Sequence, residues 1–127
     1  DVRASMVWIG ECWRDVLAPE VDAPLTVHRG GMQCSDWSDL VCFAGVGPGE
    51  VLVGRDKLVG LSHRRTRHGI RVQGLVYGAS VADEYRAVLR GPLPAAPPAG
   101  QAWQPGLDGG AIAAEIAAAI AARITTV

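Results

Sequence analysis

The chain has 127 residues, of which 49% are hydrophobic and 20% charged, and its formal net charge is -1. This length suits one domain of ordinary size, and the composition excludes a fibrous or wholly disordered protein. Because the charge is nearly balanced and no run of about 18 apolar residues is present, we expect binding to neither nucleic acid nor membrane.

The first segment has the apolar spacing of a helix. Apolar residues recur at helical intervals from Val2 to Leu17, Asp1 is placed to cap the first turn, and Pro19 closes the segment. The next apolar runs, "PLTVHRGG" and "LVCFAGV", are typical of two short strands, the first ending at its paired glycines.

The middle of the chain contains a predicted hairpin that carries the single lysine of the sequence. The runs "VLV" and "KLVGL" are joined by Gly54, Arg55 and Asp56, where a glycine supplies the positive φ that a turn needs. Lys57 therefore begins the returning strand. The segment "RHGIRVQGLVYG" supplies a further strand, whose alternation places Gln73 on the face opposite its valines.

The last third of the chain predicts two helices separated by a connector. Ser80 begins the first as N-cap, Asp83 takes a capping-box-like position, and the helix runs to Leu89. Residues 92–107 form a Pro/Ala-rich connector that we expect to be extended. Residues 108–127 predict a packing helix with isoleucine at every fourth position.

The cysteines favour reduced thiols over a disulfide framework. Their number is odd and no secretory leader precedes them, so we expect a cytoplasmic protein with buried free thiols. A metal site assembled from cysteine and histidine is not supported, since no C-x-x-C or H-x-x-x-H spacing occurs. The cysteines are Cys12, Cys34 and Cys42, and the candidate metal ligands are Cys34, Cys42, His28 and one of His63 or His68.

A basic cluster follows the predicted hairpin. The segment "HRRTRHGIR" holds Arg64, Arg65, Arg67 and Arg71, and guanidinium groups so close together must face water or bind anions. Two interpretations stay open: a charged strand edge that blocks unwanted pairing, and a site for phosphate or for an acidic partner.

Lys57 is the strongest candidate for chemistry, although a single lysine is more often a solvated surface charge. An apolar strand lies on each side of it, Gly60 lets another group approach the backbone closely, and Glu50 lies across the hairpin. An ammonium held in this way stabilises negative charge that builds up on the oxygens of a mixed carboxyl-phosphate anhydride. No phosphate-loop, dinucleotide-binding or nucleophile-elbow motif is present.

The segment "EVLVGRDKLVGLSHRR" has a recognisable order: a carboxylate-led strand, a turn, a lysine with a glycine three residues later, a serine and a basic pair. With "VCFAG" before it and "VQGLVYG" after it, the chain resembles the lipoate-protein ligase branch of the biotin/lipoate protein ligase family. The resemblance covers residues 1–91, the second half of that catalytic domain. It implies an α+β fold with a mostly antiparallel sheet and flanking helices, as in biotin ligases and class II aminoacyl-tRNA synthetases.

Enzymes of this family use ATP and Mg²⁺ to make an acyl-adenylate, then transfer a lipoyl, octanoyl or biotinyl group to a carrier-domain lysine. The resemblance implies that Lys57 contacts the carboxyl and phosphate oxygens of that intermediate, and that Glu50 stands at the family's aspartate near the metal. It implies substrate or adenylate contacts for Gly60, Arg64, Arg65 and Gln73. We therefore expect ATP and Mg²⁺ as cofactors, lipoate as substrate, a lipoyl or biotinyl carrier domain as partner, and no structural metal.

The family's earlier Arg-Arg-x-x-Gly-Gly motif has no counterpart ahead of Lys57. We expect a half-domain that pairs with an N-terminal ligase half or with a second copy, because a half-sheet leaves an open edge. Two other functions stay open: a non-catalytic module that binds an acidic carrier or a ligase subunit, and an octanoyltransferase-like enzyme that needs no ATP and uses Cys34 or Cys42. Lys57→Ala is expected to fold and to abolish acyl transfer.

Overall fold

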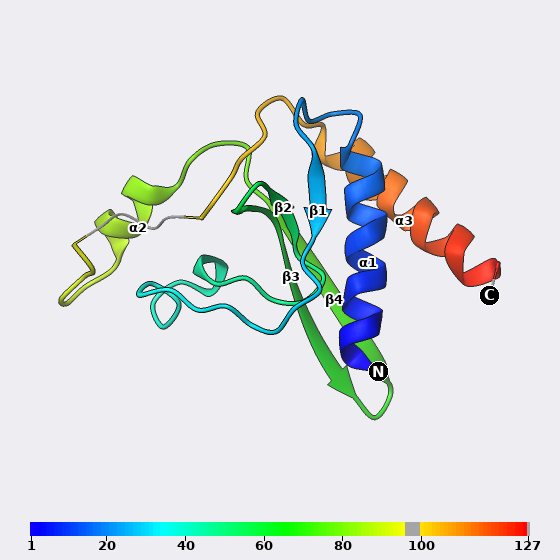
Figure 1. The fold of residues 1–127 in the computed structure, drawn as a ribbon, viewed down its shortest axis with the longest axis horizontal. Coiled ribbons are helices and arrows are strands. Elements are labelled where there is room, and N and C mark those ends of the chain that lie inside the picture. The colour runs from blue at the N-terminus through cyan, green and yellow to red at the C-terminus, as the bar shows by residue number, and fades with distance from the viewer. Residues whose placement is uncertain (96–99, 127) are drawn as a thin grey trace.

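The structure is a computed structural model that describes residues 1–95 and 100–126. It is an α+β fold built on a four-stranded antiparallel sheet (Figure 1). Helices α1 and α3 pack side by side on one face of the sheet, and residues 28–46 and helix α2 lie toward the other face. The predicted fold class, an antiparallel sheet with flanking helices, is confirmed.

Helix α1 (Val2–Leu17) forms where the apolar spacing predicts it. The Asp1 carboxylate accepts a hydrogen bond from the backbone N–H of Arg3 at 3.1 Å, which satisfies one donor of the first turn. Its buried face includes Met6, Cys12 and Leu17.

The sheet has the strand order β1-β2-β3-β4, and its strands are β1 (Leu25–Val27), β2 (Val51–Val53), β3 (Asp56–Thr66) and β4 (Gly69–Val76). The hairpin around Lys57 is confirmed, and Gly54 at its turn has a φ of +59°. Strand β1 is shorter than predicted, since it ends before the paired glycines. Within the described residues β1 and β4 are the outer strands.

The prediction of a strand over "LVCFAGV" is wrong. Cys42–Ala44 forms a 3-10 helix, η1, and Val46 makes an isolated bridge to Gln33. Phe43 and Ala44 are consecutive and both buried. A strand would point them to opposite faces, whereas a helical turn lets both enter one apolar cluster.

The predicted capping of helix α2 (Ala82–Val88) is also wrong. The N-cap residue is Val81, with no side-chain hydrogen bond, so Ser80 and Asp83 do not form a capping box. Val81 has φ -118° and ψ 17°, which places the start of the helix one residue later than the sequence pattern indicates.

Helix α3 (Gly109–Thr125) is confirmed, and the Asp108 carboxylate caps it by accepting from the N–H groups of Gly110 and Ala111. Ile112 and Ile116 pack into the apolar core that α1 and the sheet share. Part of the predicted extended connector, residues 96–99, lies outside the described residues.

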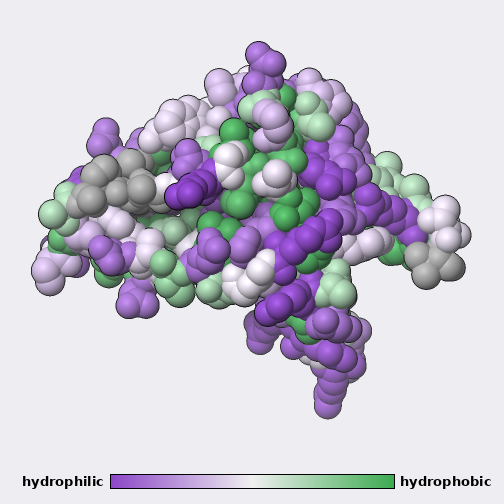
Figure 2. Space-filling view, viewed as in Figure 1, coloured by the Kyte–Doolittle hydropathy of each residue, from purple (hydrophilic) through white to green (hydrophobic). Residues whose placement is uncertain are grey.

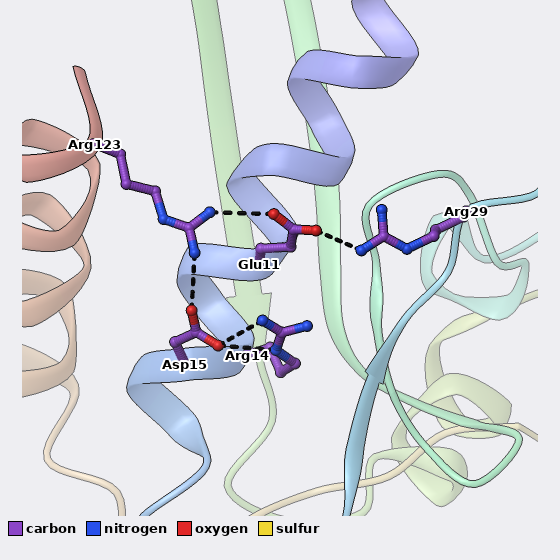
Figure 3. Close-up of polar contacts among 5 residues, drawn as sticks. All are labelled: Glu11, Arg14, Asp15, Arg29 and Arg123. Carbon is purple, nitrogen blue, oxygen red and sulfur yellow. Dashed lines mark hydrogen bonds and ion pairs between the residues drawn. The ribbon is translucent and has the colours of Figure 1, made fainter. Parts of the chain in front are cut away.

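A network of ion pairs connects α3 with α1 (Figure 3). Arg123 contacts Glu11 at 3.2 Å and Asp15 at 2.9 Å, Arg29 contacts Glu11 from the segment after β1, and Arg14 contacts Asp15 at 2.7 Å. Hydrogen bonding from Arg29 is the largest cause that lowers the pKa of Glu11; burial opposes it, and the hydrogen bond from Arg123 adds to the lowering. Each exposed pair contributes little alone, and Arg123 joins two acidic residues of α1 to α3.

No helix in the described ranges combines the length and the apolar character needed to cross a membrane.

Candidate functional site

A cavity of about 640 Å³ lies on the sheet face opposite α1 and α3. Strands β3 and β4 form its floor, and the η1 segment and α2 form its walls. Four sequence-predicted residues line it together: Glu50, Lys57, Gly60 and Gln73. Most of the other residues that line it are apolar or aromatic, including Leu40, Val41, Phe43, Leu75 and Leu89.

A β-bulge brings Lys57 and Gly60 to the same face of β3. Lys57 pairs with Leu52 and Val59 pairs with Val51, so β3 has one extra residue at Leu58. In a regular strand Lys57 and Gly60 would point to opposite faces, since their numbers differ by three. Here both contact the Phe43 ring, whereas Leu58 and Val59 enter the core beneath the sheet.

The Lys57 ammonium is buried in an ion pair. Its Nζ lies 3.1 Å from Oε2 of Glu50, and the two residues are 1% and 6% exposed. The ammonium also donates to the carbonyl oxygen of Gly45 and lies 4.4 Å from the centroid of the Phe43 ring. The alternative of a solvated surface lysine is therefore wrong.

Glu50 is the anchor of this arrangement. Its Oε2 accepts a hydrogen bond from the N–H of Gly47 at 2.7 Å, and its Oε1 accepts one from the N–H of Leu61 at 3.0 Å. The carboxylate thus connects the η1 segment, β3 and Lys57. Both oxygens are engaged, and the described part of the chain groups no three His, Cys, Asp or Glu as a metal centre would require.

Burial lowers the pKa of Lys57, and the charge and hydrogen bond of Glu50 oppose that shift. Since the folded pKa lies below the ordinary value of 10.5, the unfolded chain binds more protons between the two values. The free energy of unfolding should therefore rise with pH across that window. Urea unfolding at several alkaline pH values measures how the free energy of unfolding changes with pH. This change should be smaller in a Lys57→Met/Glu50→Gln variant than in the native protein, and an equal change would contradict the assignment to Lys57.

Gly60 is required by the close approach of Phe43. A Cβ at this position would overlap the aromatic ring. The ring in turn contacts Tyr77 at a centroid distance of 4.7 Å. Glycine here lets one aromatic residue both close the cavity and contact the Lys57 ammonium.

Sequence reasoning missed a tyrosine pair in the cavity wall. The hydroxyl oxygens of Tyr77, directly after β4, and Tyr85, in α2, are 2.6 Å apart. Burial, followed by the hydrogen bond to Tyr77, raises the pKa of Tyr85. These two hydroxyl groups are a polar feature in a largely apolar cavity wall. Residues eight apart in a strand end and a helix carry no local signal of this contact.

The structure does not bring the basic pair into the cavity. Arg64 lies beyond the cavity on the same face of β3, and strand alternation places Arg65 on the opposite face. The expectation of buried thiols holds for Cys12 alone, since Cys34 and Cys42 are exposed, and all three are free. Cys42 is exposed because η1 turns Phe43 and Ala44 inward.

Comparison of the chain with protein-family models, with curated proteins and with solved structures finds no match.

Proposed function

We propose that the cavity binds the acyl chain of a carboxylic acid, and that the chain supplies the lysine-bearing part of an acyl-adenylate ligase of the lipoate type. One observation carries the proposal: a largely apolar cavity has a single lysine ammonium in its wall. Apolar walls suit an acyl chain, and a cation in a desolvated place suits carboxylate and phosphate oxygens.

Three of the lining residues have a role in this proposal: Lys57, Glu50 and Gln73. The buried Lys57 ammonium, which Glu50 holds in place, acts through its charge on the carboxyl oxygen where the acyl-phosphate bond forms. Gln73, which lines the same cavity, offers an amide to the ligand. Glu50 does not fit the role of magnesium ligand, because Lys57 and two backbone N–H groups already engage its oxygens.

The resemblance adds the reaction class. A lipoate-type ligase activates the carboxylate with ATP and passes the acyl group to a carrier lysine, with the Arg-Arg-x-x-Gly-Gly motif lying outside these 127 residues. We therefore propose a cytoplasmic enzyme whose partners are a carrier domain and the segment that carries this motif.

Transfer of a lipoyl or octanoyl group to a purified carrier domain tests the proposal. The assay uses the natural protein or complex that contains these residues, and mass spectrometry of the carrier measures the product. The Lys57→Met/Glu50→Gln variant removes both charges at nearly constant shape and should transfer at least about a hundredfold more slowly. Arg55→Gln, at an exposed position in the neighbouring turn, is the matched control and should transfer normally.

Three results would contradict the proposal, the first by its site and the other two by its reaction. Normal transfer by the folded double variant would show that Lys57 takes no part in acyl transfer. A carrier that binds without being acylated would make the chain a binding module. Transfer from an acyl thioester without ATP, lost on alkylation of Cys42, would favour the octanoyltransferase-like function, since Cys42 lines the cavity.

A further inference from the structure

The far end of the β3–β4 hairpin carries a second candidate site. This end projects from the body of the molecule, and Figure 2 shows the projection as strongly hydrophilic. Arg64 of β3 pairs directly with Arg71 of β4, so their side chains are on the same face. On this face of the hairpin, the Arg64–Arg71 pair is the next cross-strand pair after Ser62–Gln73, two residues further along each strand. Ser62 and Gln73 both line the cavity.

Within residues 1–95 and 100–126, the charges at this end have no ion-pair partner. No Asp or Glu occurs between Asp56 and Asp83. Among the ion pairs of the described residues, none includes Arg64 or Arg71. Like charges directly opposite each other in an antiparallel pair repel, so this row favours an anion between the two guanidinium groups.

The two arginines border a hollow of about 350 Å³. The hollow is also lined by Thr66, His68, Gly69 and Ile70. Arg67 Nε donates to Nε2 of His68 at 2.8 Å, which leaves the second ring nitrogen of His68 to carry the proton. The hollow therefore combines two guanidinium groups with His68 in its lining, and its volume suits a small ligand better than a polypeptide.

We propose that Arg64 and Arg71 form a binding site for an oligophosphate group. Planar guanidinium groups bind phosphate oxygens in a bidentate manner, and two of them on adjacent strands match the charge of a diphosphate. The site lies about 7 Å along the strands from the Ser62–Gln73 row. Its formation requires neither an acyl ligand nor acyl transfer. The oligophosphate site and the proposed function can therefore be tested, and can fail, separately.

Calorimetric titration of the protein with inorganic pyrophosphate tests the site. Arg64→Gln and Arg71→Gln should each weaken binding by about tenfold to a hundredfold, because each removes a charge-assisted contact. Arg65→Gln is the matched control, since it removes the same charge one residue away on the other face of β3. It should weaken binding by less than about threefold, as expected for an exposed charge screened by salt.

The control variant makes the outcome decisive. Equal weakening by Arg64→Gln and Arg65→Gln would show diffuse attraction to a basic surface and would overturn the site, as would the absence of pyrophosphate binding by the native protein. All three arginines are exposed, so circular dichroism should show unchanged folding. Titrations with AMP and ATP identify the source: ATP binding more tightly than pyrophosphate indicates a nucleotide, equal affinity indicates any oligophosphate, and AMP should bind weakly.

Discussion

Replacing Glu50 with alanine should lower the free energy of unfolding by about 3–5 kcal/mol, because it leaves the Lys57 ammonium buried without its counter-ion. The same change removes the acceptor of the Gly47 and Leu61 N–H groups. Domains of this kind are stable by about 5–15 kcal/mol, so the variant would be close to unfolding. Urea denaturation followed by circular dichroism measures the change.

Two further variants isolate the cause. Glu20→Ala, at an exposed position after α1, should change stability by less than about 0.5 kcal/mol. Lys57→Met/Glu50→Gln should recover about 2 kcal/mol of the loss, and about 1–3 kcal/mol remains because one amide oxygen replaces two carboxylate oxygens. A Glu50→Ala protein as stable as the Glu20→Ala control would contradict the buried ion pair.

The burial of the pair also changes how Lys57 should be tested. Lys57→Ala, which the sequence suggests would fold normally, leaves the Glu50 carboxylate buried without its cation. We expect this single variant to be destabilised by about 3–5 kcal/mol, so loss of activity in it would not separate chemistry from folding. The double variant separates them.

Gly49→Ala should destabilise the fold by about 2–5 kcal/mol, from a backbone penalty and a steric one. Gly49 has a φ of +87°, and a Cβ there would overlap the backbone of Met6 in α1. The helix approaches so closely that Gly10 has the same constraint from the other side. Because Gly49 precedes Glu50, moving it also displaces the carboxylate that holds Lys57.

Gly54→Ala provides the comparison for this prediction. Gly54 also has a positive φ, +59°, but no atom lies within 4 Å of a Cβ placed there. Its replacement should therefore cost about 1–2 kcal/mol, the backbone penalty alone. Thermal or urea unfolding of the two variants measures the difference, and equal stabilities would mean that α1 does not pack against Gly49.

The parts of the fold that follow from local signals were predictable. Helix α1 and helix α3 have caps and apolar spacing within their own segments, and the hairpin has its glycine at the turn. Segment 42–44 was not predictable in this way, because its conformation depends on which apolar cluster accepts Phe43. A short apolar run fits either a strand or a buried turn.

The candidate site also has parts that the sequence predicts and parts that it does not. Glu50 across the hairpin from Lys57 follows from strand pairing, and the structure places the two in contact. The bulge at Leu58 has no sequence signature, yet it decides that Lys57 and Gly60 share a face. Arg64 and Arg65 look equivalent in the basic cluster, and they face opposite sides because β3 extends through both of them to Thr66.

Titration of the ¹⁵N-labelled native chain with octanoate tests the central claim, that the cavity binds an acyl chain with its carboxylate at Lys57. Octanoate should shift the amide signals of Gly60 and Leu61, which lie at the cavity floor, and leave Gly69 at the hairpin end unchanged. Octanol, which lacks the carboxylate, and acetate, which lacks the chain, should both bind more weakly. Shifts confined to residues outside the cavity, or equal binding of octanol and octanoate, would contradict the account.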